Sequence, residues 1–250
     1  MWNGKRIAVV LPTYRERDSI AAVIKGFESL GIVDDVLVIN NNAEPGTSDE
    51  VASTGARELL ETRQGYGAAI QRGLREVDAD LVCVCEPDAT FDPADLFKLL
   101  PFTAECDAVF GSRTVQTFIW SNANMGWFLR QGNWAVAKLI EVIFNTAYLS
   151  DVGCTYRVLS RDCVDRIAPG FVSDGSRFGL EMQLLVVLNR EHFVQVPVNY
   201  RPRVGTSAVT GDLGKAIALG IDMIGLVLRT RLQSRRIRVR LGTRPSTPLG

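Results

Sequence analysis

The sequence predicts an α/β fold in which a mostly parallel sheet is flanked by helices. Two observations support this prediction: short apolar runs rich in β-branched residues recur between residues 7 and 110, and segments with helical spacing separate them. Runs of this kind are typical of strands buried on both faces. Alternation of strand and helix favours parallel neighbours joined by right-handed crossovers. The expected strands are Ile7–Leu11, Val36–Ile39, Ala56–Glu61, Leu81–Cys85 and Asp107–Phe110.

The segments between and after these strands carry helix signals. The first helix is expected to begin at Asp18 or Ser19, since either side chain can act as the N-cap. Asp92 is expected to cap a helix that starts at the following proline. Pro197 suits an edge position in a further strand, Val194–Val198. The other expected helices are Ser48–Ser53, Gln64–Val77, the long mixed segment Asn122–Tyr148, Phe178–Asn189 and Leu213–Leu232.

Charge is distributed unevenly along the chain, although its 250 residues contain 28 basic and 28 acidic ones. Residues 1–212 are expected to form one domain, and residues 213–250 an apolar or amphipathic helix with a basic tail. No acidic residue follows Asp222, whereas arginines stand at 229, 231, 235, 236, 238, 240 and 244. Such asymmetry suggests nucleic acid or an anionic membrane surface as the partner of the tail. A disordered, merely solubilising tail is the alternative.

Composition limits the cellular context and the chemistry. The five cysteines show no metal-ligand spacing, so we expect reduced thiols in a cytosolic protein. We find neither a signal peptide nor an apolar run of about 18 residues, and any membrane contact is expected to be peripheral. The single histidine, His192, is expected in a turn after a helix. That placement argues against a Ser-His-Asp or Cys-His mechanism.

Two acids follow the apolar run Leu81–Cys85, in the segment Glu86-Pro87-Asp88. Open α/β sheets bind ligands just beyond the carboxyl ends of their strands. Mg²⁺ and Mn²⁺ take carboxylate oxygens there and are usually shared with substrate phosphates. On spacing alone, the pair is either a cation site or two loop acids that solvate a strand end.

Several further segments complete a pattern, in this order along the chain: Leu11–Glu16, Val38–Asn42, Gln64–Gly73, Glu86–Asp88, Gly111–Arg113, Asp151–Arg157 and Arg203–Ser207. Together they resemble the motifs of family-2 glycosyltransferases, which have the Rossmann-like GT-A fold. The resemblance covers roughly residues 6–207 and is nearest in pattern to dolichyl-phosphate or polyprenyl-phosphate sugar synthases. Glu86-Pro87-Asp88 stands in the place of the metal-binding D-x-D motif of that family.

The resemblance implies metal-dependent, inverting transfer of a sugar from a UDP- or GDP-linked donor. Asp88 and Glu86 would bind Mg²⁺ or Mn²⁺, with Asp88 also catalytic. Asn40 and Asn41 stand where the family usually has two aspartates, and their amides could still read a base edge; we expect Asn41 against the nucleobase. The implied nucleotide-sugar-binding residues are Pro12, Tyr14, Glu16, Asn40, Asn41, Gly65, Arg72, Glu86, Pro87, Asp88 and Arg203.

The implied acceptor is a polyprenyl or dolichyl phosphate, whose phosphate is already an anion and needs no general base. Arg113, with a catalytic role, Arg130 and Arg157 would hold that phosphate, since guanidinium matches phosphate in a bidentate way; ion pairs inside the protein are the alternative. Leu213–Leu232 and the arginine tail would then bring the site to the cytoplasmic face of a membrane, and nucleic acid is no longer expected. A tail packed against a second copy, as in a homo-oligomer, would leave the same signature.

Other functions remain as alternatives. A nucleotidyltransferase of similar fold would need a glycine-rich basic loop after the first strand, and Pro12–Arg17 contains no glycine. A glycosyltransferase acting on a soluble acceptor would share every donor-site feature. A non-catalytic nucleotide-sugar-binding subunit would account for Asn40, Asn41 and the replacement of an aspartate by Glu86.

Overall fold

The computed structural model describes residues 1–121, 123, 127–146, 148–204 and 213–243. Within them, seven strands form one sheet: β1 Ile7–Thr13, β2 Asp35–Asn40, β3 Arg57–Leu60, β4 Leu81–Val84, β5 Ala108–Ser112, β6 Arg157–Ser160 and β7 Phe193–Pro197. Their order in the sheet is β3-β2-β1-β4-β6-β5-β7. All neighbours are parallel except β6, which is antiparallel to both β4 and β5.

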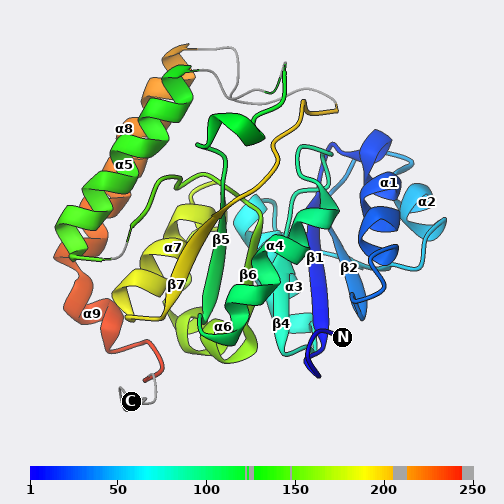
Figure 1. Cartoon of the computed structure of the whole chain (residues 1–250), viewed down its shortest axis with the longest axis horizontal. Helices are drawn as coiled ribbons and strands as arrows, with labels where there is room; N and C mark the ends of the chain where they lie inside the picture. The colour runs from blue at the N-terminus through cyan, green and yellow to red at the C-terminus, as the bar shows by residue number, and fades with distance from the viewer. Residues whose placement is uncertain (122, 124–126, 147, 205–212, 244–250) are drawn as a thin grey trace.

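Helices cover both faces of the sheet, and α5 and α8 lie side by side at one end of the molecule (Figure 1). The α-helices are α1 Arg17–Glu28, α2 Thr47–Ala52, α3 Tyr66–Glu76, α4 Leu96–Leu99, α5 Trp127–Phe144, α6 Arg161–Ile167, α7 Phe178–Leu188, α8 Leu213–Leu232 and α9 Ser234–Arg238. Short 3₁₀ helices are η1 Pro93–Asp95, η2 Leu100–Ala104, η3 Gln116–Phe118 and η4 Ala168–Gly170.

The period-2 alternation of β1 explains why both faces are covered. Ile7, Val9 and Leu11 point to one face and pack with apolar residues of α1 and α4. Ala8 and Val10 point to the other face and pack with α3, α6 and α7. Because neither face of the central strands reaches solvent, the only polar groups of β1 available to a ligand lie at its ends.

A third cluster joins α5, α7 and α8 through Val136, Ile140, Leu184 and Val227. The segment after α8 also packs onto the body: Leu241 is buried, and the backbone N–H of residue 242 donates to a carbonyl of α6. The interpretation of the tail as disordered is therefore wrong as far as residue 243. The predicted boundary between residues 212 and 213 adjoins residues 205–212, outside the described part, and stays a prediction.

Most predicted elements are confirmed, with local differences. α1 begins at Arg17, and Glu16 occupies the N-cap without a capping hydrogen bond, so neither Asp18 nor Ser19 is the cap. Asp92 does cap the next helix: its Oδ1 accepts from the N–H of residue 94 at 3.0 Å. Pro197 lies in the edge strand β7.

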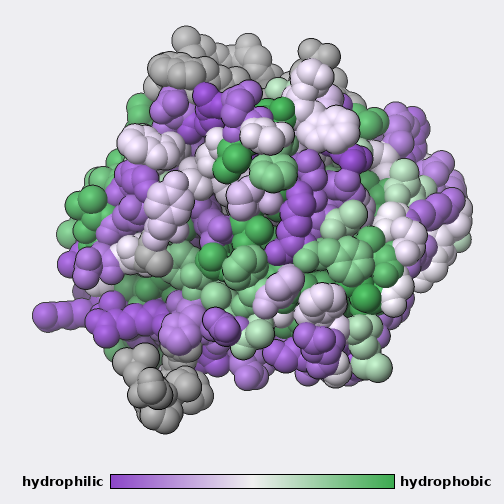
Figure 2. All heavy atoms as spheres, in the orientation of Figure 1, coloured by the Kyte–Doolittle hydropathy of each residue, from purple (hydrophilic) through white to green (hydrophobic). Residues whose placement is uncertain are grey.

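The structure also places the cysteines, the single histidine and the apolar surface. All five cysteines are free thiols, and His192 is exposed after α7. None of the helices in the described ranges combines the length and apolar character needed to cross a bilayer. Figure 2 shows hydrophobic side chains over α4 and at the edge formed by α5, among mostly hydrophilic surface. The ends of the predicted helix 122–148 and the motif residues 205–207 lie at or beyond the limits of the described residues.

Candidate active site

The candidate site lies at the edge of the sheet where β1, β2, β4 and β5 end. Parallel strands place their carboxyl ends together, so the loops that follow them converge. β6 begins at the same edge, because Arg157 is paired with Val84 of β4 and Phe110 of β5. The segment Arg201–Val204 returns to this edge, where the N–H of Val204 donates to the carbonyl of Asp88.

The loop after β4 holds the two predicted metal ligands. Asp88 is only 1% exposed, and its Oδ1 accepts from the N–H and hydroxyl of Thr90. Its Oδ2 is buried and accepts no hydrogen bond, although the Arg203 guanidinium contacts it as an ion pair. The same Nη2 of Arg203 lies 3.1 Å from Oε2 of Glu86. One guanidinium therefore bridges both carboxylates.

Strain and electrostatics mark the same loop. Ala89 adopts a left-handed conformation with φ of 62°, which is uncommon for a residue with a side chain. Desolvation raises the pKa of Glu86, and the neighbouring Asp88 raises it further, while Arg203 and Arg113 oppose the shift. A divalent cation beside this carboxyl would stabilise its charged form.

The loop after β1 is held in shape by Glu16. Its Oε2 accepts from the backbone N–H of Tyr14 at 2.8 Å and of Arg15 at 2.9 Å, and from the Thr13 hydroxyl. Tyr14 remains exposed, so its ring is available to a ligand. The predicted binding residues Pro12 and Glu16 thus shape this edge. At the start of α1, a serine hydroxyl donates to the carbonyl of Pro87 at 2.6 Å, which joins this loop to the loop of Asp88.

Asn41 has a different role from the predicted one. Its buried amide donates to the carbonyls of Glu61 and Arg63, and accepts from Gly65 N–H at 2.7 Å and from the Gln64 side chain. Both N–H groups and both lone pairs are used, so the amide has no capacity left for a base edge. The expectation that Asn41 contacts the nucleobase does not fit this structure. Asn41 instead fixes the segment Gln64–Gly67 at the start of α3, which we call the glycine loop.

Asn40, by contrast, ends β2, and its side chain faces β3 and α2. Its Nδ2 donates to Oε1 of Glu58 at 2.8 Å and to the hydroxyl of Ser48 at 3.2 Å. Its Oδ1 accepts from the N–H of Ala43. Asn40 therefore stabilises the loop after β2, and its predicted contact with the nucleotide stays a prediction.

The glycine loop before α3 packs tightly on residues 173–174. A Cβ at Gly65, whose φ is 146°, would lie 2.2 Å from the carbonyl oxygen of Asp174. A Cβ at Gly67 would lie 2.4 Å from the carbonyl oxygen of Ser173. Both glycines are needed for this close approach, whatever else they contact. Arg72, farther along α3, pairs with Glu76 at 3.2 Å, and no described contact joins it to the carboxylate pair.

Arg113, at the end of β5, is held by a buried acid. Its Nε and Nη2 donate to the two carboxylate oxygens of Asp151 at 2.9 and 3.0 Å, and its backbone N–H donates to one of them. The guanidinium also lies over the ring of Tyr200, 5.3 Å from its centroid. Burial alone would raise the pKa of Asp151, but Arg113 and the surrounding N–H donors hold it below its usual value.

The other two predicted phosphate ligands differ in burial. Arg157 is 3% exposed and donates to the backbone carbonyls of Gly179 and Cys154. Its burial lowers its pKa. A guanidinium enclosed in this way supports the core, and the assignment of Arg157 to the acceptor phosphate stays a prediction. Arg130, near the start of α5, donates to the side chain of Gln116 and remains accessible.

Three residues that support the site were not assigned to it from the sequence: Thr90, which orients Asp88; Asp151, which holds Arg113; and Asp174, which abuts the glycine loop. Asp151 could have been found, because it opens the segment Asp151–Arg157 that contributed to the family resemblance. Asp174 could not, because its contribution is a backbone carbonyl.

The sequence matches the family described as Glycosyl transferase family 2 over residues 8–167. This chain is a family-2 glycosyltransferase. An uncharacterised glycosyltransferase of Mycobacterium tuberculosis is 29% identical over 226 residues, which cover 88% of this chain and 96% of that protein. A dolichyl-phosphate hexose transferase of Haloferax volcanii is 24% identical, with 91% and 96% covered. An undecaprenyl-phosphate mannosyltransferase of Micrococcus luteus is 25% identical over 251 residues, with 95% and 99% covered.

Solved structures show the same fold. The glucosyl-3-phosphoglycerate synthase of Mycobacterium tuberculosis, crystallised with Mn²⁺, UDP and glucosyl-3-phosphoglycerate, superposes with a TM-score of 0.66 at 18% identity, over 97% of this chain and 82% of that one. A further mycobacterial protein superposes with a TM-score of 0.71 at 19% identity, over 91% and 75%. The family-2 glycosyltransferase therefore has the predicted GT-A fold.

Proposed function

We propose that this family-2 glycosyltransferase uses a divalent cation to transfer a sugar, with inversion, from a UDP- or GDP-linked donor to a polyprenyl or dolichyl phosphate. The observation that carries the donor half is the pair of carboxylates at the end of β4, with the buried Oδ2 of Asp88 free of hydrogen bonds. The acceptor half is supported by the relatives of similar length that are named for dolichyl-phosphate and undecaprenyl-phosphate transfer.

The residues present fit Mg²⁺ or Mn²⁺. Both ions take oxygen ligands, and Glu86 and Asp88 offer carboxylate oxygens on one side of the site. Within the described ranges, no cluster of three His, Cys, Asp or Glu side chains is suited to a metal, so diphosphate and water would supply the remaining ligands. When bound, the ion would neutralise charge that develops on the leaving diphosphate.

The chain's own residues divide the remaining work. Arg203 lies beside both carboxylates, and its other N–H groups could contact the diphosphate. The positive charge of Arg113 lowers the pKa of Glu86, which indicates that the two side chains face the same part of the site. We place the acceptor phosphate there. That phosphate is already an anion, and it can attack without a base to remove a proton. Arg130 is the second candidate to hold it.

Attachment to a membrane surface would bring a lipid acceptor to this site. α8 carries an exposed apolar stripe with helical spacing, formed by Ile221, Ile224, Leu228 and Leu232. An apolar stripe next to arginines is typical of helices that lie in the interface of an anionic bilayer. A nucleotide-sugar donor and free thiols favour the cytoplasmic face. A homo-oligomer that buries the same stripe is the alternative.

A soluble phosphorylated acceptor is the second candidate. Its support is the likeness to glucosyl-3-phosphoglycerate synthase, which was crystallised in complex with Mn²⁺, UDP and glucosyl-3-phosphoglycerate. The same arginines would serve that acceptor, because the group they recognise is a phosphate in either case. The two candidates differ only in whether a lipid chain is required.

A screen of radiolabelled UDP- and GDP-sugars tests the proposal, with polyprenyl phosphate in detergent or 3-phosphoglycerate as the acceptor, and with Mn²⁺ or EDTA. We expect label in the lipid fraction in the presence of Mn²⁺ alone. Transfer only to the soluble acceptor would replace the first candidate by the second. Donor binding without turnover in any combination would support a non-catalytic subunit.

A further inference from the structure

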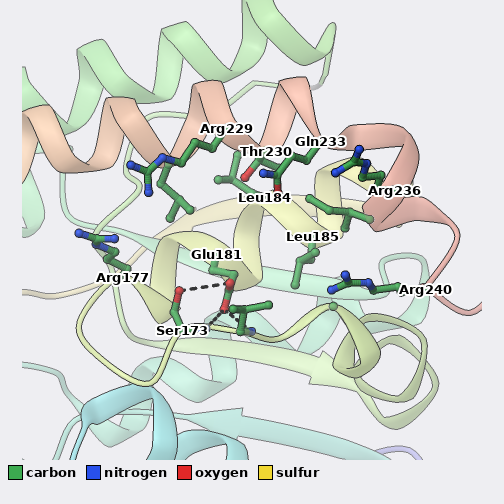
Figure 3. Close-up of a pocket in the computed structure, with 14 residues that line it drawn as sticks. Ser173, Arg177, Glu181, Leu184, Leu185, Arg229, Thr230, Gln233, Arg236 and Arg240 are labelled. Atoms are coloured by element: carbon green, nitrogen blue, oxygen red, sulfur yellow. Dashed lines mark hydrogen bonds between the residues drawn. The ribbon is translucent and has the colours of Figure 1, made fainter.

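A cavity of about 450 Å³ lies outside the sugar-transfer site, between α7 on one side and α8 with α9 on the other. Its volume is within the usual range for small-molecule sites. The apolar part of its lining comes from Val172, Leu184, Leu185, Leu226 and Ile237. Arginines, one glutamate and small or uncharged polar residues line the rest, and Figure 3 shows arginines at both ends of the cavity.

Four arginines line this cavity, which we call the arginine pocket. Arg177 and Arg229 lie at one end, and Arg236 and Arg240 lie at the other (Figure 3). Arg177 is paired with Asp222 of α8. The other three have no acidic partner within the described part of the chain. These three guanidinium groups are exposed, and together they give the mouth of the cavity a positive potential that favours an anion.

The one acid in the lining does not cancel this charge. The carboxylate of Glu181 accepts from the backbone N–H of Val172 and of Ser173, and from the Ser173 hydroxyl (Figure 3). These hydrogen bonds fix the floor of the pocket. The carbonyl of Ser173 in turn accepts from Gln71 of α3 at 3.0 Å. The pocket is therefore preformed, which lowers the entropic cost of binding a ligand.

The pocket borders the exposed apolar stripe of α8. Arg229 follows the stripe residue Leu228, and Gln233, which also lines the pocket, follows Leu232. Successive helix residues lie about 100° apart around the axis, so Arg229 stands at the flank of the stripe, whereas Leu226 and Thr230 face away from it, toward α7. Arg229 therefore marks the edge at which the pocket and the stripe meet.

We propose that the arginine pocket binds the phosphate head group of an anionic lipid, separately from the sugar donor and acceptor. The guanidinium groups would bind the phosphate by charge-assisted hydrogen bonds. The apolar lining contributed by α7, α8 and α9 would hold the glyceride and the first part of its chains. This goes beyond the proposed sugar transfer, because the pocket shares no residue with the carboxylate pair or with Arg113.

Calorimetric titration of the full chain with dihexanoyl phosphatidic acid, kept below its micelle concentration, tests the pocket without a membrane. The test variant is Arg229→Ala with Arg236→Ala, and the matched control is Arg231→Ala with Arg235→Ala. Both remove two exposed arginines from the same region, but only the first pair lines the pocket. We expect the test variant to bind about tenfold or more weakly, and the control to bind like wild type.

Two further arms identify the source of the phosphate. Inorganic phosphate at the same concentration should bind much more weakly than the lipid; equal binding would overturn the lipid assignment. Vesicles of phosphatidylcholine with phosphatidylglycerol should retain the wild type and the control better than the test variant. Equal losses in both double variants would show only a general charge effect and would also overturn the proposal. Because no arm uses a sugar donor, failure of the proposed transfer reaction leaves this result unaffected.

Discussion

At the scale of single residues, Asp88 has an environment that folding alone does not explain. It is almost fully buried, follows a strand end, and precedes a residue in a left-handed conformation. One of its oxygens is used by Thr90, and the other meets only Arg203. A buried carboxylate recovers its desolvation cost only when it is paired, and here the single charged partner is an arginine shared with Glu86.

We expect Asp88→Asn to fold normally and to lose sugar transfer by roughly a hundredfold or more, or about 3 kcal/mol of transition-state stabilisation. An amide oxygen can still accept from Thr90, so the loop should keep its shape. Initial rates at saturating Mn²⁺ and a thermal melt measure the two effects. Asp78→Asn, in a fully solvated pair with Arg6, is the control. Full activity of Asp88→Asn in EDTA would remove this residue from the metal site.

Asp151 offers a test of stability against pH. Its pKa is lower in the folded chain than the ordinary value of about 3.9, so its contribution is fully present above that pH and is lost below it, as the pH falls through the lower folded-state pKa. We expect Asp151→Asn to lower the free energy of unfolding at pH 7 by about 3–5 kcal/mol, because Arg113 is left buried without its partner. The loss of stability in acid should be correspondingly smaller in the variant.

Urea unfolding at pH 7 and at a series of pH values below about 3.9 checks this prediction. Asp35→Asn is the matched control, since Asp35 also accepts two hydrogen bonds from one arginine, Arg57, but at an exposed site. That change should cost about 1 kcal/mol or less. If the two variants lose equal stability, burial does not strengthen the Arg113–Asp151 pair as we infer.

The sequence predicted the chemistry of the site better than the partners of each side chain. Glu86, Asp88 and Arg203 do come together, because strand ends and a returning segment converge at one edge. Asn41 and Arg157 have different partners from those expected. Both side chains donate to backbone carbonyls. Every residue has a backbone carbonyl, so the sequence does not show which one a side chain will bind.

At the scale of elements, the strands were predictable and one orientation was not. Apolar runs locate β1, β2, β4 and β5 because these strands are buried on both faces. β6 is antiparallel and separates β4 from β5. Strand direction depends on the path of the intervening chain. Hydrophobic periodicity predicts where a strand lies but not the direction in which it runs. The long segment before β6 was read only as mostly helical.

The glycine loop gives an element-scale prediction. We expect Gly67→Ala to destabilise the fold by about 1–3 kcal/mol and to weaken binding of UDP or GDP, because a Cβ there would lie 2.6 Å from that of Phe178 and closer still to a carbonyl oxygen. Thermal unfolding and calorimetric titration measure the two effects. Gly175→Ala is the control, since a Cβ at Gly175 meets nothing within 4 Å. Wild-type stability of Gly67→Ala would show that α7 can move away.

At the scale of the whole molecule, the stripe on α8 should decide attachment to vesicles. Leu232 is 86% exposed and Leu228 is 46% exposed, so charges there should not disturb the core. We expect Leu228→Glu with Leu232→Glu to keep the thermal stability of the wild type and to lose binding to anionic vesicles, measured by co-sedimentation. Val142→Glu on α5, also exposed, is the control. Unchanged sedimentation would favour a second copy as the partner of the stripe.

Truncation is a poorer test of the same idea. Arg238 donates to a carbonyl at the end of α7, and the carbonyl of Gly242 accepts from Asn189. Removing residues after 232 would therefore disturb packing as well as charge. A tail rich in arginine was predictable from composition, but its docking was not, because few apolar residues mark the contact.

The antiparallel β6 has a consequence for engineering. β5 ends at the site edge and β6 begins there, so the chain from residue 113 to residue 156 leaves and re-enters the fold at the same place. The strands β1 to β4, at whose ends we propose the donor, are complete before this excursion starts. The excursion is bounded by two fixed strand ends, yet Ile140, Asp151 and Tyr156 within it are buried in the body. A segment exchanged between Arg113 and Arg157 to alter acceptor choice would therefore have to keep these three residues.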